Sequence, residues 1–460
     1  MGIDFSDVQA NILRGFNARQ ARHFLLAGSR ASGTAQFIGA LLNGPGPRIS
    51  TAESWNERPH YALTLGLTAP GLAALGLPPA LMAAFPDAFV AGAAARADSL
   101  GDVQGGAPTQ WAYGGRDAEH LVLSLYTDEH RHASLHALTR QLRGLMAQHG
   151  LAELGAFDAE AFEHGEVHFG YRDGIAQPRI EGVPRKRADD MPDLQPAANP
   201  GEFLLGHHYQ NAFGGNWLGD LPPELGNNGS YGVLRMIRQE VARFETLLQT
   251  VATRYGVDPE WVAAKLMGRW RNGVPLTLAP SAPPGQTQPA PLPAKQLNRF
   301  DYAPTAEHPT FFDDPQGLRC PIGSHIRRLN PRSALVMGKP HTRRIIRRAM
   351  PYGPRWQPGQ ADDGVERGLL GYFVCGDVAS QFEFLLQTWA NRDFATHGLR
   401  GSTEPILGLQ PPQGGRFVIR TDNGLDPIVI DSLPQLTVTR GCLYCFLPGM
   451  GGLRRLAALA

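Results

Sequence analysis

Two short segments of the chain carry side chains suited to acid–base and metal chemistry. Asp173 is the one carboxylate in a five-residue segment bounded by Gly170 and Gly174. Glycine allows a tight turn and a close approach to a flat ligand, and a positioned carboxylate can take a proton and return it. Far downstream, His325 lies in a segment rich in arginine, and imidazole is a common iron ligand. Alternatively, the aspartate caps a turn and the histidine is structural.

A third segment, residues 343–353, contains four arginines followed by Pro-Tyr-Gly. A guanidinium placed at a reacting oxygen, for which Arg347 is the candidate, stabilises charge that develops there. Alternatively, this segment is a basic strand or turn on the surface.

Histidine pairs are candidates for a different kind of metal site. His132 and His136 lie four residues apart on an expected helix, a spacing that can bind a metal. No cluster of cysteine or glutamate nearby completes such a site, and the HExxH, GxSxG and Walker motifs are absent from the sequence. Further pairs of this kind are His164 with His168 and His207 with His208.

The composition is that of an ordinary globular protein. The chain has 460 residues, of which 42% are hydrophobic and 18% charged, and its net charge is +1. That charge balance does not favour nucleic acid or an acidic membrane surface as a partner. No apolar run is long enough for a membrane span, and the N-terminus lacks the features of a signal peptide. We therefore expect a cytoplasmic protein.

The four cysteines do not indicate a disulfide framework. Cys442 and Cys445 have CxxC spacing, but they lie in an apolar run that we expect to be a strand. Residues three apart on a strand face opposite sides, so a metal or redox pair is disfavoured. The sequence has no CxxCH motif, so covalent attachment of a c-type haem is not indicated.

The pattern along the chain alternates strands with helices and lacks a Gly-rich dinucleotide loop, which favours an α+β fold over a Rossmann fold. Residues 183–201 and the Pro-rich segment 279–294 are expected to be loops. Strands are expected at 61–68, 120–126, 368–375 and 435–447, and helices at 6–16, 128–149, 230–253, 258–269, 377–391 and 450–459.

The wider string around Asp173, residues 163–182, resembles the signature of the dye-decolorising peroxidase family, in which GxxDG carries a distal acid. The segment around His325 resembles the family segment whose histidine binds haem iron, and Arg347 resembles the arginine that precedes a Pro-aromatic-Gly turn. Other landmarks resemble the family in the expected order over most of the chain: Leu100-Gly-Asp102, Trp111, Asn228–Tyr231, Lys265–Trp270, Asn298–Tyr302, Gln381–Phe384, Trp389 and Thr437–Pro448.

The resemblance implies two ferredoxin-like modules, 1–165 and 166–460, with a non-covalent b-type haem mainly in the second. It implies His325 as the axial iron ligand, with Asp173 and Arg347 on the opposite side of the haem. Gly371 departs from the bulkier residue that the family pattern leads us to expect, so the pocket could be looser. The other residues expected at the haem are Gly170, Gly174, Arg332, Leu370 and Tyr372.

The activity implied by the resemblance is reduction of hydrogen peroxide coupled to oxidation of a bulky organic donor, in a protein that could form a homo-oligomer. Because a carboxylate has a lower reference pKa than imidazole, such activity should favour acidic pH. The alternative is a haem or porphyrin carrier, or an iron-releasing haem protein, without peroxidase turnover.

Two features of this expected site stay open at the level of sequence. An axial imidazole needs an acceptor for its second nitrogen, and Glu383, Glu404 and Asp431 are all candidates. A large dye that cannot enter the pocket would have to be oxidised through an aromatic side chain near the surface; we hypothesise such a role for at least one of Tyr352, Trp356, Tyr372 and Trp389.

Overall fold

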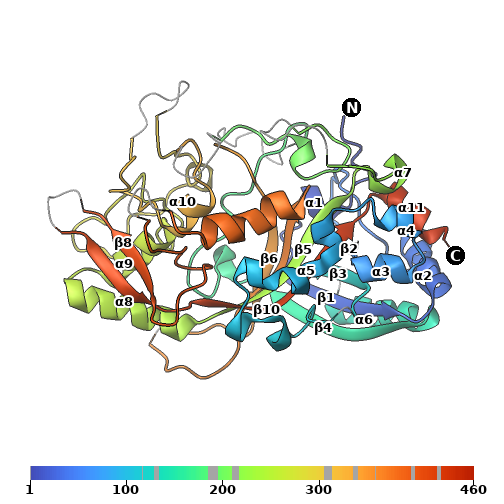
Figure 1. Ribbon diagram of the computed structural model, residues 1–460, viewed down its shortest axis with the longest axis horizontal. Coiled ribbons are helices and arrows are strands. Elements are labelled where there is room, and N and C mark those ends of the chain that lie inside the picture. The colour runs from blue at the N-terminus through green and yellow to red at the C-terminus, as the bar shows by residue number, and fades with distance from the viewer. Residues whose placement is uncertain are drawn as a thin grey trace.

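The computed structural model describes the chain except residues 1, 117, 129–133, 185–194, 210–216, 305–312, 335–339, 358, 395–398, 422–425 and 460. Its main feature is a mixed arrangement of helices around one large antiparallel sheet (Figure 1). The strands are β1 Gln20–Gly28, β2 Tyr61–Leu67, β3 Leu121–Thr127, β4 Leu151–Glu160, β5 Ser230–Gln239, β6 Ile346–Tyr352, β7 Gly368–Cys375, β8 Gly415–Ile419, β9 Ile428–Leu433 and β10 Thr437–Leu447.

The sheet consists of two halves with the same topology. The order of its eight strands is β4-β1-β3-β2-β10-β5-β7-β6. In each half the fourth strand along the chain lies beside the first, followed by the third and the second. This is the ferredoxin-like arrangement, so the predicted α+β class with two ferredoxin-like modules is confirmed. We predict the boundary between the modules at residue 165, in the connection between β4 and β5.

The two halves meet at two places, where β10 pairs with β2 and where the end strands β4 and β6 come together. β10 pairs with β2 through Phe446 and Leu67. The two end strands, β4 and β6, pack against each other, so the sheet curls into a barrel. Side chains of both halves, including Leu25, Leu234 and Cys445, form one buried cluster in its interior.

Helices cover the outside of the barrel. In Figure 1, α2, α3, α4 and α11 lie at one end of the molecule, and α8, α9 and the β8–β9 hairpin lie at the other. The α-helices are α1 Ala10–Leu13, α2 Ala31–Asn43, α3 Ala69–Ala74, α4 Pro79–Met82, α5 Asp87–Leu100, α6 Leu135–Gln148, α7 Pro223–Gly226, α8 Val241–Tyr255, α9 Pro259–Met267, α10 His325–Leu329 and α11 Met450–Ala457. Two π-helical segments follow β7, η7 Val378–Glu383 and η8 Leu385–Ala390, and short 3-10 turns lie at Gln104–Gly106, Pro108–Gln110, Glu163–Gly165, Pro200–Glu202 and Ala294–Gln296.

One predicted helix is wrong. Residues 230–253 form strand β5 and then helix α8, with Glu240 between them. β5 lies between two other strands, and nine of its ten residues are buried. A strand buried on both faces loses the alternation of apolar and polar residues that identifies a strand in a sequence.

Other expected elements differ mainly in their ends. The helix expected at 6–16 is a single turn, and the helix expected at 128–149 begins at Leu135, with 129–133 outside the described residues. The strand that contains Cys442 and Cys445 is present, and the two thiols lie in different buried clusters on opposite faces of the sheet, as predicted.

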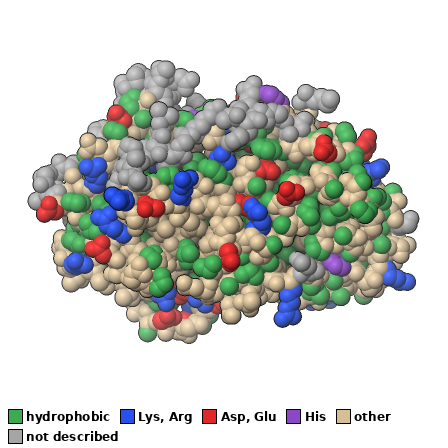
Figure 2. Space-filling view, in the orientation of Figure 1, with side chains coloured by type: hydrophobic (Ala, Val, Ile, Leu, Met, Phe, Trp, Pro, Cys, Tyr) green, Lys and Arg blue, Asp and Glu red, His purple; other side chains and the backbone are tan. Residues whose placement is uncertain are grey.

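The surface shows no concentration of one charge on the face in view. In Figure 2, basic and acidic side chains are interspersed over the part drawn in colour. Within the described ranges, no helix is both long and apolar enough to cross a membrane.

Candidate active site

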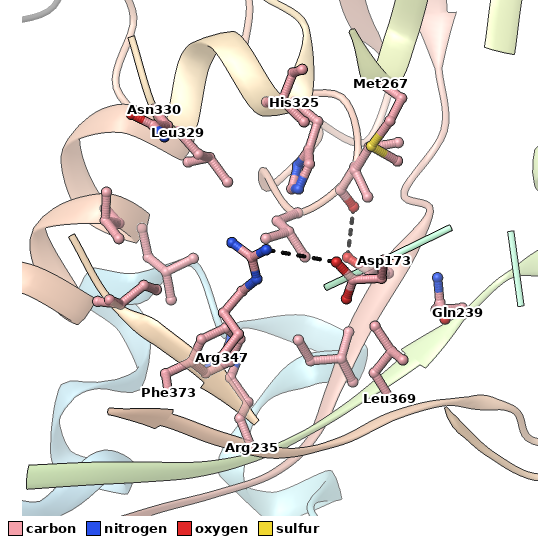
Figure 3. Close-up of a pocket in the computed structure, with 18 of the residues that line it drawn as sticks. Asp173, Arg235, Gln239, Met267, His325, Leu329, Asn330, Arg347, Leu369 and Phe373 are labelled. Atoms are coloured by element: carbon pink, nitrogen blue, oxygen red, sulfur yellow. Dashed lines mark hydrogen bonds and ion pairs between the residues drawn. The ribbon is translucent and has the colours of Figure 1, made fainter. Parts of the chain in front are cut away.

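A cavity of about 600 Å³ lies beside the C-terminal half of the sheet. Its size is in the usual range for a site that encloses a small molecule or cofactor. Strands β5, β6 and β7 contribute one wall, and the segment that begins α10 contributes another. Figure 3 shows His325 pointing into this space from one side, with Asp173 and Arg347 pointing into it from the other.

His325 is the first residue of α10, and its imidazole is held from behind by a carboxylate. Nδ1 lies 3.1 Å from Oε1 of Glu404. Because an ionised carboxylate can only accept, Nδ1–H donates, which leaves Nε2 with a free lone pair toward the cavity. Of the other two candidates, Glu383 pairs with Arg96, and Asp431 is a surface residue near Arg416.

Glu404 is fully buried, but its surroundings favour its charged form. Burial raises the pKa of this carboxyl, yet the electrostatic attraction and hydrogen bond of the His325 N–H, together with the backbone N–H groups of Leu407 and Ile406, lower the pKa below its usual value overall. Oε1 accepts from Ile406 N at 3.0 Å, and Oε2 accepts from Leu407 N and, at 3.2 Å, from Gly408 N. The imidazole therefore has an anion as its hydrogen-bond acceptor.

The arginines around His325 have different roles. Arg327 is buried and pairs with Asp314 at 2.9 Å. Arg328 is buried and donates to the backbone oxygens of Trp389 and Ser402. Both therefore anchor α10 to its surroundings, whereas Arg332 lies on the cavity lining.

Arg332 and Arg269 form a pair of buried cations at the cavity. Both are at most 5% exposed, and neither has an ion pair with a carboxylate in the part of the chain that the structure describes. Burial, and then the charge of Arg332, lower the pKa of Arg269 to about 9. The Arg332 guanidinium stacks on Phe300, 3.6 Å from the ring centroid. Two cations in this position fit a ligand with anionic groups, such as the two propionates of haem.

Asp173 and Arg347 meet on the opposite wall. Arg347 Nη2 lies 3.6 Å from Asp173 Oδ1, as the dashed line in Figure 3 marks. The Arg347 side chain is 35% exposed and the Asp173 side chain 47%, because both open onto the cavity. The arrangement holds a proton acceptor beside a fixed cation.

Gln177 positions Arg347, and its role was not predicted. Its Nε2 donates to Arg347 O at 2.9 Å, and Arg347 N donates to its Oε1 at 3.1 Å. β6 is an end strand of the sheet, so it has a hydrogen-bonded strand on one side only. The Gln177 amide makes, with the backbone of Arg347, the two hydrogen bonds that a second neighbouring strand would make. Gln177 lies within the string that carries Asp173, which is the only sequence signal for it.

Gly170 and Gly174 shape the turn but do not line the cavity. Both have positive φ values, +79° and +77°, which favour glycine. A Cβ on Gly170 would also lie 2.8 Å from Nη1 of Arg271. The two glycines therefore shape the turn that places Asp173, and their direct contact with a cofactor stays a prediction.

The expected pocket residues Leu370 and Tyr372 do not line the cavity; a neighbouring residue of each does. Both side chains are buried on the barrel side of β7, and the side chains that line the cavity are Leu369 and Phe373. Gly371 does not loosen the cavity, because a Cβ there would lie 2.1 Å from the backbone oxygen of Arg348 on β6. The close approach of the two strands explains the glycine.

The four aromatic residues suggested for dye oxidation differ in exposure. Trp356, Tyr372 and Trp389 are 7%, 1% and 2% exposed. Tyr352 is half-buried, and its hydroxyl donates to Glu366 at 3.0 Å. Only Tyr352 among them is placed to reach a donor at the surface.

The histidine pairs do not form a metal site in the part of the chain that is described. There, no group of three or more His, Cys, Asp or Glu side chains could hold a metal ion. His132 lies outside the described residues. His168 is buried, with its Nε2 2.7 Å from Tyr352 O, and burial lowers its pKa to about 4.

No protein-family model matches the chain. Individual proteins do: Peroxidase 2 of Mycetinis scorodonius is 28% identical over 99% of this chain and 88% of its own length. The multifunctional dye peroxidase DyP2 of Amycolatopsis sp. is 29% identical over 86% of this chain and 82% of its own length.

Solved structures share the fold over nearly the whole chain. A fungal DyP-type peroxidase from Auricularia auricula-judae has a TM-score of 0.80 at 23% identity, covering 99% of this chain and 100% of that one. A dye-decolorising peroxidase in complex with 2,6-dimethoxyphenol has a TM-score of 0.77 at 25% identity, with the same coverage. With relatives matched along nearly its full length, a shared fold and an imidazole facing an Asp–Arg pair, the chain is similar to dye-decolorising peroxidases in sequence, in fold and in the arrangement of its site.

Proposed function

We propose that the protein is a haem peroxidase that reduces hydrogen peroxide and oxidises organic donors such as phenols and dyes. The observation that carries this proposal is the placement of His325, backed by Glu404, across a cavity from the Asp173–Arg347 pair. One wall can hold iron and the other can handle the protons of a peroxide.

We infer that the cofactor is a non-covalent b-type haem. His325 Nε2 would bind its iron, and Arg269 and Arg332 would neutralise its propionates. When bound, the haem would supply the iron that exchanges electrons with peroxide and with the organic donor. Glu404 keeps the imidazole in the tautomer whose Nε2 is free and increases the basicity of that nitrogen.

The opposite wall then carries out the proton transfers. Asp173 Oδ1 takes the proton from the peroxide oxygen that is nearer to the His325 side of the cavity. It returns this proton to the other peroxide oxygen, which leaves as water. Arg347 stabilises the negative charge that develops while the O–O bond breaks. Gln177 keeps this guanidinium in place through its two backbone contacts.

The donor class rests on relatives. Several are named dye-decolorising peroxidases, and one solved structure is a complex with 2,6-dimethoxyphenol. We propose that this chain likewise oxidises phenols and dyes.

Rapid mixing of the purified ferric holoprotein with one equivalent of hydrogen peroxide tests the proposal. We expect a fast change in the haem absorption spectrum that reverses when a dye is added, with the dye consumed. A carrier or an iron-releasing protein would instead show slow bleaching without turnover, and that result would reject the peroxidase.

A further inference from the structure

Tyr444 on β10 carries a hydrogen bond that the proposed mechanism does not use. Its hydroxyl donates to Oε1 of Glu383 at 2.9 Å, in the buried core outside the barrel. Glu383 is 1% exposed and is paired with Arg96 through two contacts, 2.8 Å from Nε to Oε1 and 2.5 Å from Nη2 to Oε2. Arg96 is 34% exposed, so the group extends from the core to the surface. A buried phenol therefore has an arginine-paired carboxyl group as its direct hydrogen-bond acceptor.

The strand register connects Tyr444 to the active-site wall. Arg347 on β6 pairs with Phe373 on β7, Phe373 pairs with Val233 on β5, and Val233 pairs with Tyr444 on β10. Side chains of directly opposed residues lie on the same face of a sheet, and neighbouring strands are about 4.8 Å apart. Tyr444 is thus three strands from Arg347, in one row on one face.

Packed aromatic rings bridge that row. The Tyr444 ring contacts the Phe382 ring at 6.2 Å between centroids, and Phe382 contacts Phe373 at 5.4 Å. Phe373 lies on the cavity wall beside Arg347 (Figure 3). A dense protein path without an intervening solvent gap therefore joins the cavity to the phenol.

The proton acceptor distinguishes Tyr444 from two other buried tyrosines, Tyr302 and Tyr231. Tyr352 also donates to a carboxylate, but it is half-buried and lies outside the row that contains Phe373. Oxidation of a phenol by one electron makes its hydroxyl strongly acidic, so the proton must have somewhere to go. Tyr302 lines the cavity, but its buried hydroxyl has no partner among the described residues, and the Arg327 cation lies 4.5 Å from its ring centroid. The buried Tyr231 hydroxyl, in the same core cluster as Tyr444, likewise has no partner among the described residues.

We propose that Tyr444 is an internal one-electron donor to the peroxide-oxidised haem, with Glu383 as its proton acceptor. The inference rests on the proposed function. One electron leaves the Tyr444 ring for the haem, and the hydroxyl proton moves to Oε1 of Glu383, which leaves a neutral phenoxyl radical. An external donor then returns one electron to the ring, and Glu383 returns the proton. The residue stores one oxidising equivalent when no donor is at the cavity.

Freeze-quench electron paramagnetic resonance of the holoenzyme tests this role. The holoenzyme is mixed with one equivalent of hydrogen peroxide and no donor, in protein with normal or ring-deuterated tyrosine. We expect a tyrosyl signal that narrows on deuteration and is lost in Tyr444→Phe. The matched controls Tyr231→Phe and Tyr302→Phe, which remove tyrosines without a described proton acceptor, should keep it.

Glu383→Gln tests the role of the proton acceptor independently of the phenol. It keeps the size of the side chain but cannot take the proton, so the signal should fall while Tyr444 is still present. Haem occupancy and the thermal midpoint of each variant are measured alongside, and Arg96→Gln, which also breaks the ion pair but leaves the carboxylate, should retain more of the signal than Glu383→Gln.

The outcomes separate this inference from the proposed function. A tyrosyl signal that persists unchanged in Tyr444→Phe, or that is absent from the wild type although peroxide changes its haem spectrum, overturns the role of Tyr444 alone. A wild-type haem spectrum that does not respond to peroxide overturns the peroxidase proposal itself, and the internal donor with it.

Discussion

The two halves of the sheet have the same strand order, yet only one carries the site. In the N-terminal half, the connection between the first two strands, residues 29–60, contains the helix α2. In the C-terminal half, the corresponding connection, residues 240–345, contains α8, α9 and α10. His325, Arg269 and Arg332 all belong to that longer connection.

This difference shows where the chemistry of the fold resides. The strands of the C-terminal half contribute Arg347, Leu369 and Phe373 to the cavity, and Asp173 comes from the segment that links the halves. The sheet supplies a rigid wall, and connections outside the sheet supply the iron ligand and the buried cations. The N-terminal half lines the cavity only with residues 100–106, at the end of its sheet-covering helix α5 and just after it, and not with its strands. Substitutions on its strands and on α6 should therefore leave haem chemistry intact.

The largest effect is expected at the iron ligand. His325→Ala should lose most of the bound haem, because no other imidazole faces Asp173 and Arg347 among the described cavity residues. The ratio of haem to protein absorbance after purification measures this. His136→Ala, which removes an exposed histidine from α6 of the N-terminal half, should keep full occupancy. Full occupancy with an unchanged spectrum in His325→Ala would rule out the ligand.

The distal pair should control rate without controlling haem content. Asp173→Asn and Arg347→Leu each remove one interaction with the reacting peroxide, and such losses typically cost ~10²–10³ in rate. Stopped-flow mixing with peroxide gives the rate and shows which of the two residues dominates. The control Asp158→Asn breaks the ion pair with Arg22 at 2.6 Å in the N-terminal half and should react normally. Wild-type rates in both distal variants would contradict the mechanism.

The cations should contribute to haem affinity. Arg332→Gln removes a charged hydrogen-bond donor worth about 1.5–3 kcal/mol, so the haem dissociation constant should rise roughly 10- to 100-fold. Titration of the haem-free protein with haemin measures this change. Arg143→Gln, which removes a surface partner of Glu153 in the N-terminal half, is the matched control. Equal affinities for the two variants would show that Arg332 does not meet the propionates.

A histidine in the N-terminal half should limit stability in acid. Burial lowers the pKa of His23 to about 4 from 6.5, so the unfolded chain binds the proton more tightly between those values. Stability from the neutral ring is complete above pH 6.5 and is lost as pH falls toward 4, by about 2 kcal/mol between pH 7 and 5. Urea unfolding of His23→Phe should show a flatter pH dependence than the wild type. The exposed-site variant His136→Phe should retain the wild-type slope; equal slopes in all three proteins would exclude His23 as the cause.

The smallest expected effect concerns large donors. Tyr352→Phe should lower the steady-state rate with a bulky dye but not with a small phenol, since Tyr352 is the half-buried member of the proposed aromatic set. Tyr61→Phe changes a half-buried tyrosine on β2, the corresponding strand of the N-terminal half, and should alter neither rate. Undiminished dye oxidation in Tyr352→Phe would direct attention to a route at the haem edge.

The parts of the site that lie in compact sequence motifs could be predicted. Asp173, His325 and Arg347 each occur within a short string of recognisable residues, and the structure brings all three to one cavity. Glu404 could not be selected from three candidates, because its contact with His325 spans 79 residues and depends on the tertiary fold.

The failures have a common physical origin in the buried strands. β5 and β7 are covered on both faces, so apolar residues point to both sides of each strand instead of alternating with polar ones. That removes the signal that would have identified β5 as a strand, and the signal that would have pointed Leu369 instead of Leu370 toward the cavity. Patterns with exposed faces, such as α6 with its regularly spaced buried leucines, were easier to identify.

The position of β10 has a consequence for how the chain is made. Of the eight strands of this sheet, β10 is the last to be synthesised, but it lies in the middle of the sheet, between β2 and β5. Until residues 437–447 leave the ribosome, both neighbours expose unpaired backbone groups, which are templates for association with other chains. Nascent or C-terminally truncated chains should therefore depend on chaperones far more than the finished protein.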